Sequence, residues 1–203
     1  MSRPEKTRRS TSEKSNYRNI SSKMTRIILI TGGQRSGKSE YAEQMALKNS
    51  DHPVYLATSR IWDDEFRHRV EIHKQRRGPQ WTNVEEEKYL SRHDFTGRTV
   101  VVDCVTLWAT NFFFDLQHEA YHSAKAASEH VERTLQELKD EFCKLTQQDA
   151  TFIFVTNEIG SGGVSDNEVQ RKFTDVEGWM NQFVASRADE VILMVSGIPV
   201  KIK

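Results

Sequence analysis

Cysteine, long apolar runs and net charge are scarce or missing in this sequence. Its 203 residues include two cysteines, Cys104 and Cys143, which are too few for a disulfide framework. There is no apolar run of roughly 18 residues, so no transmembrane helix is expected. The first residues also lack the apolar stretch of a secretory signal. These absences argue against a disulfide-stabilised secreted domain and predict a protein of the reducing cytoplasm.

The lack of net charge argues against a dedicated nucleic-acid binder, which usually carries an excess of basic residues. The 29 Lys and Arg residues balance the 29 Asp and Glu residues only over the whole chain. Residues 1–24 carry seven basic and two acidic side chains, a net +5, so the remainder carries −5. Phosphate ligands of the acidic part must therefore be captured by a local basic cluster rather than by the overall field.

Residues 1–24 are rich in Ser, Arg, Lys and Asn. They offer too little apolar surface to offset chain entropy, so we expect a disordered basic tail followed by one folded domain over residues 25–203. A basic arm for nucleic acid or a transit segment is the alternative. Met24 directly precedes the first apolar run and is a second candidate for the translation start. Deleting residues 1–23 is expected to leave activity intact.

Apolar runs alternate with helical patterns after Met24. The alternation predicts an α/β fold of the P-loop NTPase type, with a doubly wound, mostly parallel sheet in a single domain. The predicted strands are 26–31, 53–58, 98–103, 151–156, 190–196 and a short last strand, 198–202, that pairs back through Gly197. The predicted helices are 37–49, 62–77, 116–145 and 167–186.

The segment after the first strand has the pattern G-x-x-x-x-G-K-[ST] of the phosphate-binding P-loop. Its glycines let backbone N–H groups surround phosphate oxygens, and the following helix adds positive charge at its N-terminus. We expect Lys38 to act catalytically on the β- and γ-phosphates and Ser39 to ligate Mg²⁺. A glycine-rich surface turn is the alternative. The segment comprises Gly32, Gly33, Gln34, Arg35, Ser36, Gly37, Lys38 and Ser39.

A P-loop enzyme also needs an acidic residue at the end of a neighbouring strand to hold Mg²⁺. Asp103 closes the apolar strand 98–103 and is the best candidate for this second metal ligand. A carboxylate that caps the next segment is the alternative.

The predicted helix 62–77 carries one histidine among arginines. Basic neighbours would favour the neutral imidazole of His73, which can act as a nucleophile. A solvated, charged helix with a single histidine is the alternative. Spacings of 4, 4 and 3 align one helix face, made of Glu65, Arg69, His73 and Arg76.

An ordered set of motifs makes the sequence recognisable from about Ile27 to Lys203. These stretches resemble the adenosylcobinamide kinase / adenosylcobinamide-phosphate guanylyltransferase family of cobalamin biosynthesis. The P-loop alone is unspecific, but the order and spacing of the whole set are highly specific. The stretches are GGQRSGKSEYAE, YLATSRIWDDEFRHRVEIHKQRRGPQWTNVEE, VVVDCVTLWATN, TNEIGSGGVSDNEVQRKFTDVEGWMNQ and VSGIPVKIK.

The resemblance implies a two-step enzyme that uses ATP and GTP as substrates with Mg²⁺. The first step phosphorylates the aminopropanol hydroxyl of adenosylcobinamide. The second takes GMP from GTP onto a histidine, releases pyrophosphate, and passes GMP to adenosylcobinamide phosphate, giving adenosyl-GDP-cobinamide. The partners implied are these nucleotides and corrinoids, in a homotrimer, with no nucleic acid and no stable membrane span.

The family's functional residues can be carried over position by position. The guanylylated histidine falls on His73, which with Lys38 makes the predicted catalytic pair. The resemblance implies nucleotide-binding residues in the P-loop and at Ala57, Thr58, Ser59, Lys74, Gln75, Arg76, Arg77, Glu85 and Asp103. The metal ligands remain Ser39 and Asp103.

The sequence departs from the family pattern in four places, and this puts corrinoid affinity in doubt more than nucleotide chemistry. One is Gly78, which stands where a proline often follows the arginine, with Pro79 one position later. A double histidine is reduced to Ile72-His73, the G-x-G-I-V-P loop becomes 160–165 without its Ile and Pro, and R-x-F-R-D has Thr174 in place of its second arginine. Two other functions stay open. One is a P-loop kinase without guanylyl transfer, and the other is a non-catalytic nucleotide-binding regulator.

Other residues have a structural and a functional interpretation. Residues 118–122 match the zinc pattern H-E-x-x-H, but a solvated helix start explains them better. Trp81 and Trp108 fall on family positions, and we expect their side chains to pack in the core rather than to bind a ligand. Asn157 and Glu158 end a strand at the edge where α/β proteins bind ligands. They could either contribute to a binding site or cap the loop that follows.

Overall fold

A computed structural model of the chain describes residues 25–61, 64, 68, 71, 74, 77–115 and 124–203. The predicted tail, residues 1–24, lies outside the described residues. So do most of the predicted helix 62–77, the start of the predicted helix 116–145 and the H-E-x-x-H pattern at 118–122. Within the described part of the chain, every helix is too short or too polar to cross a membrane.

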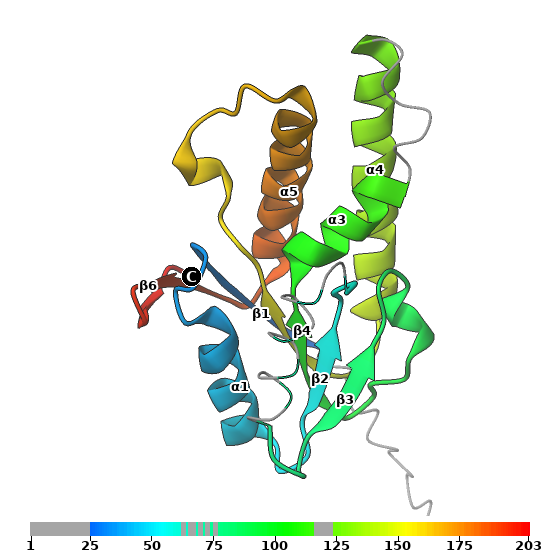
Figure 1. Cartoon of the computed structure of the whole chain (residues 1–203). Helices are drawn as coiled ribbons and strands as arrows, with labels where there is room; N and C mark the ends of the chain where they lie inside the picture. The colour runs from blue at the N-terminus through cyan, green and yellow to red at the C-terminus, as the bar shows by residue number, and fades with distance from the viewer. Residues whose placement is uncertain are drawn as a thin grey trace, which may run out of the picture.

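Seven strands of the described chain form one sheet, in the order β3-β2-β4-β5-β1-β6-β7 (Figure 1). The first six strands run parallel, and β7 pairs antiparallel with β6. The strands are β1 Arg26–Gly32, β2 Val54–Ala57, β3 Thr82–Glu85, β4 Thr99–Asp103, β5 Thr151–Val155, β6 Glu190–Val195 and β7 Ile198–Lys201.

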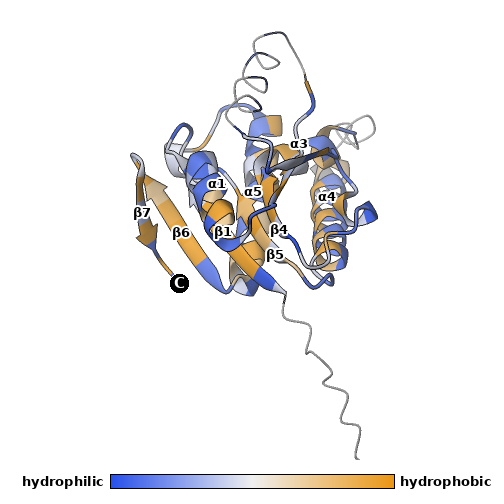
Figure 2. Cartoon of the chain, turned by 90° about the horizontal axis from the view of Figure 1, so that it is seen from below, coloured by the Kyte–Doolittle hydropathy of each residue, from blue (hydrophilic) through white to orange (hydrophobic). Residues whose placement is uncertain are grey.

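Helices cover both faces of the sheet. Alternate residues of β1 point to opposite faces: Leu29 packs in the core under α3, α4 and α5, while Ile28 packs in the core that includes α1. Figure 2 shows mostly hydrophobic strands beside helices of mixed hydropathy. The helices are α1 Lys38–Asn49, α3 Val105–Asp115, α4 Ala124–Leu145 and α5 Glu168–Arg187, with short 3₁₀ turns η1 Leu90–Arg92 and η3 Gly160–Gly162. The doubly wound α/β fold is confirmed.

The parallel arrangement gathers several chain segments at one edge of the sheet. β4 lies between β2 and β5, and β5 lies beside β1. The loops that leave these four strands therefore meet at their carboxyl ends, where open α/β sheets bind ligands. The P-loop leaves β1 at this edge, and Asp103 ends β4 there.

The predicted strand positions are confirmed to within two residues, including the last strand that pairs back after Gly197. Sequence analysis did not predict β3 or α3. Residues 105–115 are apolar around most of the helix and largely buried, so they show no amphipathic period. Phe112 and Phe113 of α3 are buried in the core. Within α4, the predicted helix is confirmed from Ala124.

Candidate functional site

The P-loop lies between β1 and the first turn of α1. Gly37 precedes α1 with φ 91°, a conformation that favours glycine. The Lys38 side chain folds back over the loop, where Nζ donates to the Gly33 carbonyl at 2.6 Å. Lys38 is 7% exposed, and burial lowers its pKa, although Cys104, Asp103 and Glu177 oppose that shift. A partly desolvated ammonium at the N-terminus of α1 is well suited to phosphate oxygens.

Gly32 is fixed by its neighbours on β6. Its φ is 152°, and a Cβ placed there would lie 2.6 Å from the Met194 carbonyl oxygen. On the other side of the loop, the Gly197 amide donates to the Ser36 carbonyl at 3.0 Å. The loop is therefore packed against the β6–β7 hairpin, which restricts its shape before any ligand binds.

Asp103 ends β4 close to the P-loop. Its Oδ2 accepts a hydrogen bond of 2.6 Å from the Tyr55 hydroxyl on β2. Burial, followed by the Asp103 carboxylate, raises the pKa of Tyr55 well above its ordinary value, so the phenol stays protonated as the donor. The carboxylate is thus oriented by a neutral donor from the adjacent strand.

A cavity of about 750 Å³ opens at the carboxyl edge of the sheet. It brings together residues of the P-loop, the end of β2, the end of β4 and the segment before β3. Of the predicted site residues, those that line it are Gln34, Arg35, Ser36, Gly37, Lys38, Ser39, Ala57, Ser59, Lys74, Arg77 and Asp103.

Other predicted site residues are placed differently. Thr58 is fully buried, and its hydroxyl bonds to the backbone of Cys104. Glu85 is exposed at the end of β3, where it pairs with Lys74 Nζ at 2.6 Å. His73, Gln75 and Arg76 lie outside the described residues, so their roles stay predictions.

Arg77 borders the cavity, but its side chain is 3% exposed and turned into the protein. Its guanidinium carbon lies 3.6 Å from the centroid of the Tyr55 ring. Nη1 is 3.5 Å from Glu43 Oε1 on α1, and Nε donates to Asn83 Oδ1 at 2.8 Å. The charge of Arg77 is therefore compensated inside the protein.

The loop after β5 contributes further cavity residues. Asn157 and Glu158, for which a site role was one of two interpretations, both line the cavity, as does Ile159. The Glu158 amide donates to the Gly32 carbonyl at 3.1 Å, which ties this loop to the P-loop. The sequence feature that indicated a site role for Asn157 and Glu158 was their position directly after a buried strand.

A buried polar network supports this loop from α3 and α5 and was not found by sequence reasoning. The Thr106 hydroxyl donates to Glu177 Oε1 at 2.9 Å and accepts from the Asn157 amide at 2.9 Å. Asn181 donates to the Asn157 carbonyl at 3.0 Å. Burial raises the pKa of Glu177 to about 7. Thr106 and Glu177 are 71 positions apart, so no local motif signals the contact.

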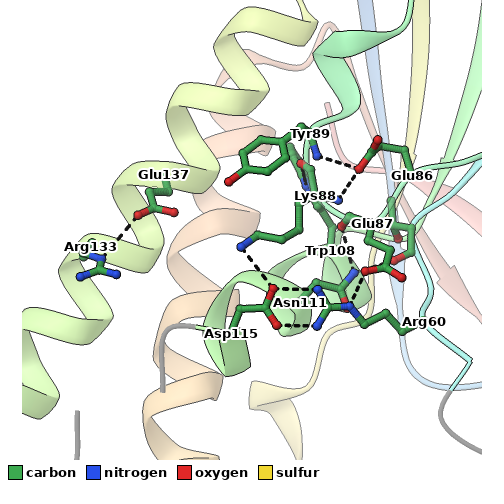
Figure 3. A network of polar contacts seen from close by, with 11 residues as sticks. Arg60, Glu86, Glu87, Lys88, Tyr89, Trp108, Asn111, Asp115, Arg133 and Glu137 are labelled. Atoms are coloured by element: carbon green, nitrogen blue, oxygen red, sulfur yellow. Dashed lines mark hydrogen bonds and ion pairs between the residues drawn. The ribbon is translucent and has the colours of Figure 1, made fainter. Parts of the chain in front are cut away.

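A second polar cluster lies where the chain leaves β2 toward residue 62 (Figure 3). Arg60 forms two parallel bonds with Asp115 at the end of α3, of 2.5 and 2.7 Å, and its Nε bonds Glu87 at 2.5 Å. Lys88 Nζ lies 3.3 Å from Asp115. The arginine holds the pKa of Asp115 down at about 2. This cluster fixes one end of the segment that carries His73.

Trp108 and Asn111 hold the neighbouring loop in place. The Trp108 indole donates to the Lys88 carbonyl at 2.8 Å, and the Asn111 amide donates to the carbonyls of Thr58 and Glu87. Trp108 is fully buried, in agreement with its assignment to the core. Among the described residues, no group of three His, Cys, Asp or Glu side chains is placed to hold a metal ion.

Comparison of the whole chain with known proteins gives consistent results. The bifunctional adenosylcobalamin biosynthesis protein CobU of Escherichia coli (strain K12) is 38% identical over 186 residues, covering 87% of this chain and 99% of the relative. CobU of Salmonella typhimurium is 37% identical over 184 residues with the same coverage. The bifunctional adenosylcobalamin biosynthesis protein CobP of Pseudomonas aeruginosa is 33% identical over 179 residues, covering 86% of this chain and 96% of the relative.

Solved structures agree on the fold. An ATPase from a type III secretion system aligns with a TM-score of 0.50 and 14% identity, covering 84% of this chain and 51% of that chain. This similarity concerns the P-loop fold alone. A profile of the family described as cobinamide kinase / cobinamide phosphate guanyltransferase matches residues 28–202. With its P-loop, its strand-end Asp103 and full-length relatives above 30% identity, the chain belongs to the cobinamide kinase / cobinamide phosphate guanyltransferase family.

Proposed function

We propose that this chain phosphorylates adenosylcobinamide with a nucleoside triphosphate and then transfers GMP from GTP, through a covalent intermediate on His73, to adenosylcobinamide phosphate. The observation that carries the proposal is the common cavity of Lys38, Ser39 and Asp103 at the carboxyl edge of the sheet. Lys74 and Arg77, which follow His73 in the sequence, border the same cavity.

The residues present fit a Mg²⁺·nucleotide complex. Ser39 and Asp103 offer hard oxygen ligands on the same cavity as the phosphate-binding backbone, which suits a small divalent cation. Bound there, Mg²⁺ would neutralise charge on the transferring phosphoryl group. Lys38 is already within the loop and would move from the Gly33 carbonyl to the β- and γ-phosphates.

In the kinase step, the acceptor hydroxyl attacks the γ-phosphorus and the nucleoside diphosphate leaves. In the second step, a ring nitrogen of His73 attacks the α-phosphorus of GTP, the bond to pyrophosphate breaks, and a phosphoramidate forms. A phosphate oxygen of adenosylcobinamide phosphate then attacks the same phosphorus and releases His73. Basic side chains beside the cavity supply charge stabilisation to both steps.

The decisive experiment follows the α-phosphate of GTP. Wild-type protein with Mg²⁺ should acquire an acid-labile, alkali-stable label from α-labelled GTP. His73→Ala should lose the label while it still binds GTP and still transfers the γ-phosphate. His52→Ala is the matched control, because His52 is exposed before β2 and should leave labelling unchanged. A wild type that phosphorylates adenosylcobinamide but never labels would reduce the function to a kinase.

A further inference from the structure

The Arg77 side chain is packed against three elements, of which β2 and α1 contact the strand that ends at Asp103. It lies over the Tyr55 ring of β2, pairs with Glu43 of α1 and donates to Asn83 of β3. Its guanidinium group uses one face and at least two of its nitrogens in these contacts. Several partners hold such a group at once. Moving the guanidinium away from them would therefore cost considerable free energy.

Tyr55 connects this arginine to the candidate metal ligand. The Arg77 guanidinium carbon lies 3.6 Å from the centroid of the Tyr55 ring, and the Tyr55 hydroxyl donates to Asp103 Oδ2 at 2.6 Å. A phenol under a cation is a stronger donor, because the positive charge draws electron density from the ring. The edge of Trp81, 6.2 Å away, packs the same ring from another side. The tyrosine is therefore fixed in the position that orients the carboxylate.

The family resemblance implies a different role for Arg77, that of a nucleotide contact. A phosphate ligand needs an exposed guanidinium, yet this one is 3% exposed and already paired with Glu43. Lys74 also has a carboxylate partner, Glu85, but the Lys74 side chain is 35% exposed, its partner is exposed, and it borders the same cavity. The two basic residues on either side of the undescribed positions 75 and 76 thus differ in what they can reach.

We propose that Arg77 and Tyr55 are positioning residues that hold Asp103 for the divalent cation, rather than contacts to the nucleotide phosphates. Tyr55 occupies Oδ2 of Asp103, so Oδ1 is the oxygen that we assign to the cation. Arg77 is the first described residue after positions 75 and 76, so its contacts with Tyr55 and Glu43 belong to the described part of the chain. This inference rests on the proposed function, since it assumes a metal–nucleotide complex at the cavity.

The test measures binding separately for metal and nucleotide. Mn²⁺ is titrated by electron paramagnetic resonance at saturating GTP, and GTP is titrated in excess chelator. Tyr55→Phe keeps the ring under Arg77 and removes only the hydroxyl. We expect it to weaken Mn²⁺ binding about tenfold, as loss of one charge-assisted hydrogen bond does, with metal-free GTP binding unchanged. Tyr89→Phe is the control, because Tyr89 contacts Phe112 rather than Asp103.

Arg77→Gln provides the second, independent variant. We expect a similar loss of Mn²⁺ affinity and a change of less than twofold in metal-free GTP affinity. The opposite pattern, weak metal-free GTP binding with normal Mn²⁺ affinity, would identify Arg77 as a phosphate ligand and overturn the inference. Normal Mn²⁺ affinity in Tyr55→Phe would overturn it as well. A wild-type protein that binds no GTP at all would instead contradict the proposed function.

Discussion

The hydroxyl of Thr58 forms two hydrogen bonds with the backbone of Cys104, donating to its carbonyl and accepting from its amide, each at 2.8 Å. Both residues are buried, and they join the end of β2 to the start of α3 directly beside Asp103. The Thr58 amide also donates to the Asp103 carbonyl at 3.1 Å. A residue that the family resemblance places at the nucleotide therefore holds the backbone around Asp103.

Replacing this hydroxyl tests its structural role. Thr58→Val has nearly the same shape but leaves two buried backbone groups of Cys104 without their partner, which should cost about 2 kcal/mol of unfolding free energy in urea. Thr58→Ser retains the hydroxyl and should cost less. Metal-free GTP binding should be unchanged in both. Loss of GTP affinity at unchanged stability would instead favour a direct nucleotide contact.

The two glycines that open the P-loop should differ sharply in their tolerance of a side chain. In Gly32→Ala the new Cβ would meet the Met194 carbonyl oxygen at 2.6 Å, in a backbone conformation that is strained for alanine. For Gly33 there is no atom within 4 Å of the added Cβ among the described residues. We expect Gly32→Ala to lower both the melting temperature and GTP affinity.

Gly33→Ala is the matched control for that substitution. It should keep the melting temperature within a few degrees of wild type, because its Cβ points into open space. Differential scanning fluorimetry with and without GTP compares the two variants under identical conditions. Equal destabilisation by both would mean that the loop tolerates no side chain for reasons other than its contact with Met194.

Much of this site could be predicted from the sequence because its main determinants are local. The P-loop occupies eight consecutive positions directly after one apolar run. Asp103 directly follows another apolar run, so each feature can be recognised from the residues next to it. The contacts that orient these groups are not local. Tyr55 meets Asp103 across 48 positions, and Thr106 meets Glu177 across 71. Only the order of strands in the sheet brings such pairs together.

Burial explains the other differences between sequence and structure. Arg77 follows a histidine in a basic segment, a pattern that predicts a phosphate contact. The sequence does not indicate that its side chain packs against Tyr55 and Glu43, as the structure shows. Helix α3 was missed because a helix buried on nearly all sides lacks the polar stripe that marks a surface helix. The contacts that are hardest to predict from the sequence are those of polar side chains that find their hydrogen-bond or ion-pair partners inside the protein.

The Arg60–Asp115 ion pair should matter for the segment that follows Arg60. Asp115→Asn removes one charge from a bidentate, partly buried pair, and should cost about 1 kcal/mol of unfolding free energy. Because Arg60 fixes the chain before residue 62, histidine labelling from α-labelled GTP should slow severalfold while γ-phosphate transfer changes little. Rapid-quench labelling measures the first rate, and a coupled assay measures the second.

An exposed pair on α4 serves as the comparison for Asp115→Asn (Figure 3). Glu137 lies 3.5 Å from Arg133, and both side chains are more exposed than those of Arg60 and Asp115. Glu137→Gln should change stability by less than about 0.5 kcal/mol and leave labelling unaffected. Equal slowing of labelling by both substitutions would show that Arg60 has no specific part in holding the segment.

Glu177 should make stability depend on pH. It is 1% exposed, it accepts a hydrogen bond from Thr106, and the charged groups that interact with it are Glu158 and Lys38. Burial raises its pKa from 4.5 to about 7. Below pH 4.5 the carboxyl is protonated in both the folded and the unfolded chain, so its ionisation does not lower the free energy of unfolding. As the pH rises, the unfolded chain releases a proton that the folded chain retains, so the folded state becomes less favoured until about pH 7.

Glu177→Gln removes this titration and keeps an oxygen that can accept from Thr106. The variant should match wild type near pH 5 and become more stable than wild type above pH 7, by at most about 3 kcal/mol at 1.4 kcal/mol per pH unit. Urea unfolding at pH 5, 6, 7 and 8 measures the difference, with the exposed Glu132→Gln as control. A difference that stays constant over this range would show that Glu177 ionises normally in the folded protein, and that burial beside Thr106 does not hold its proton.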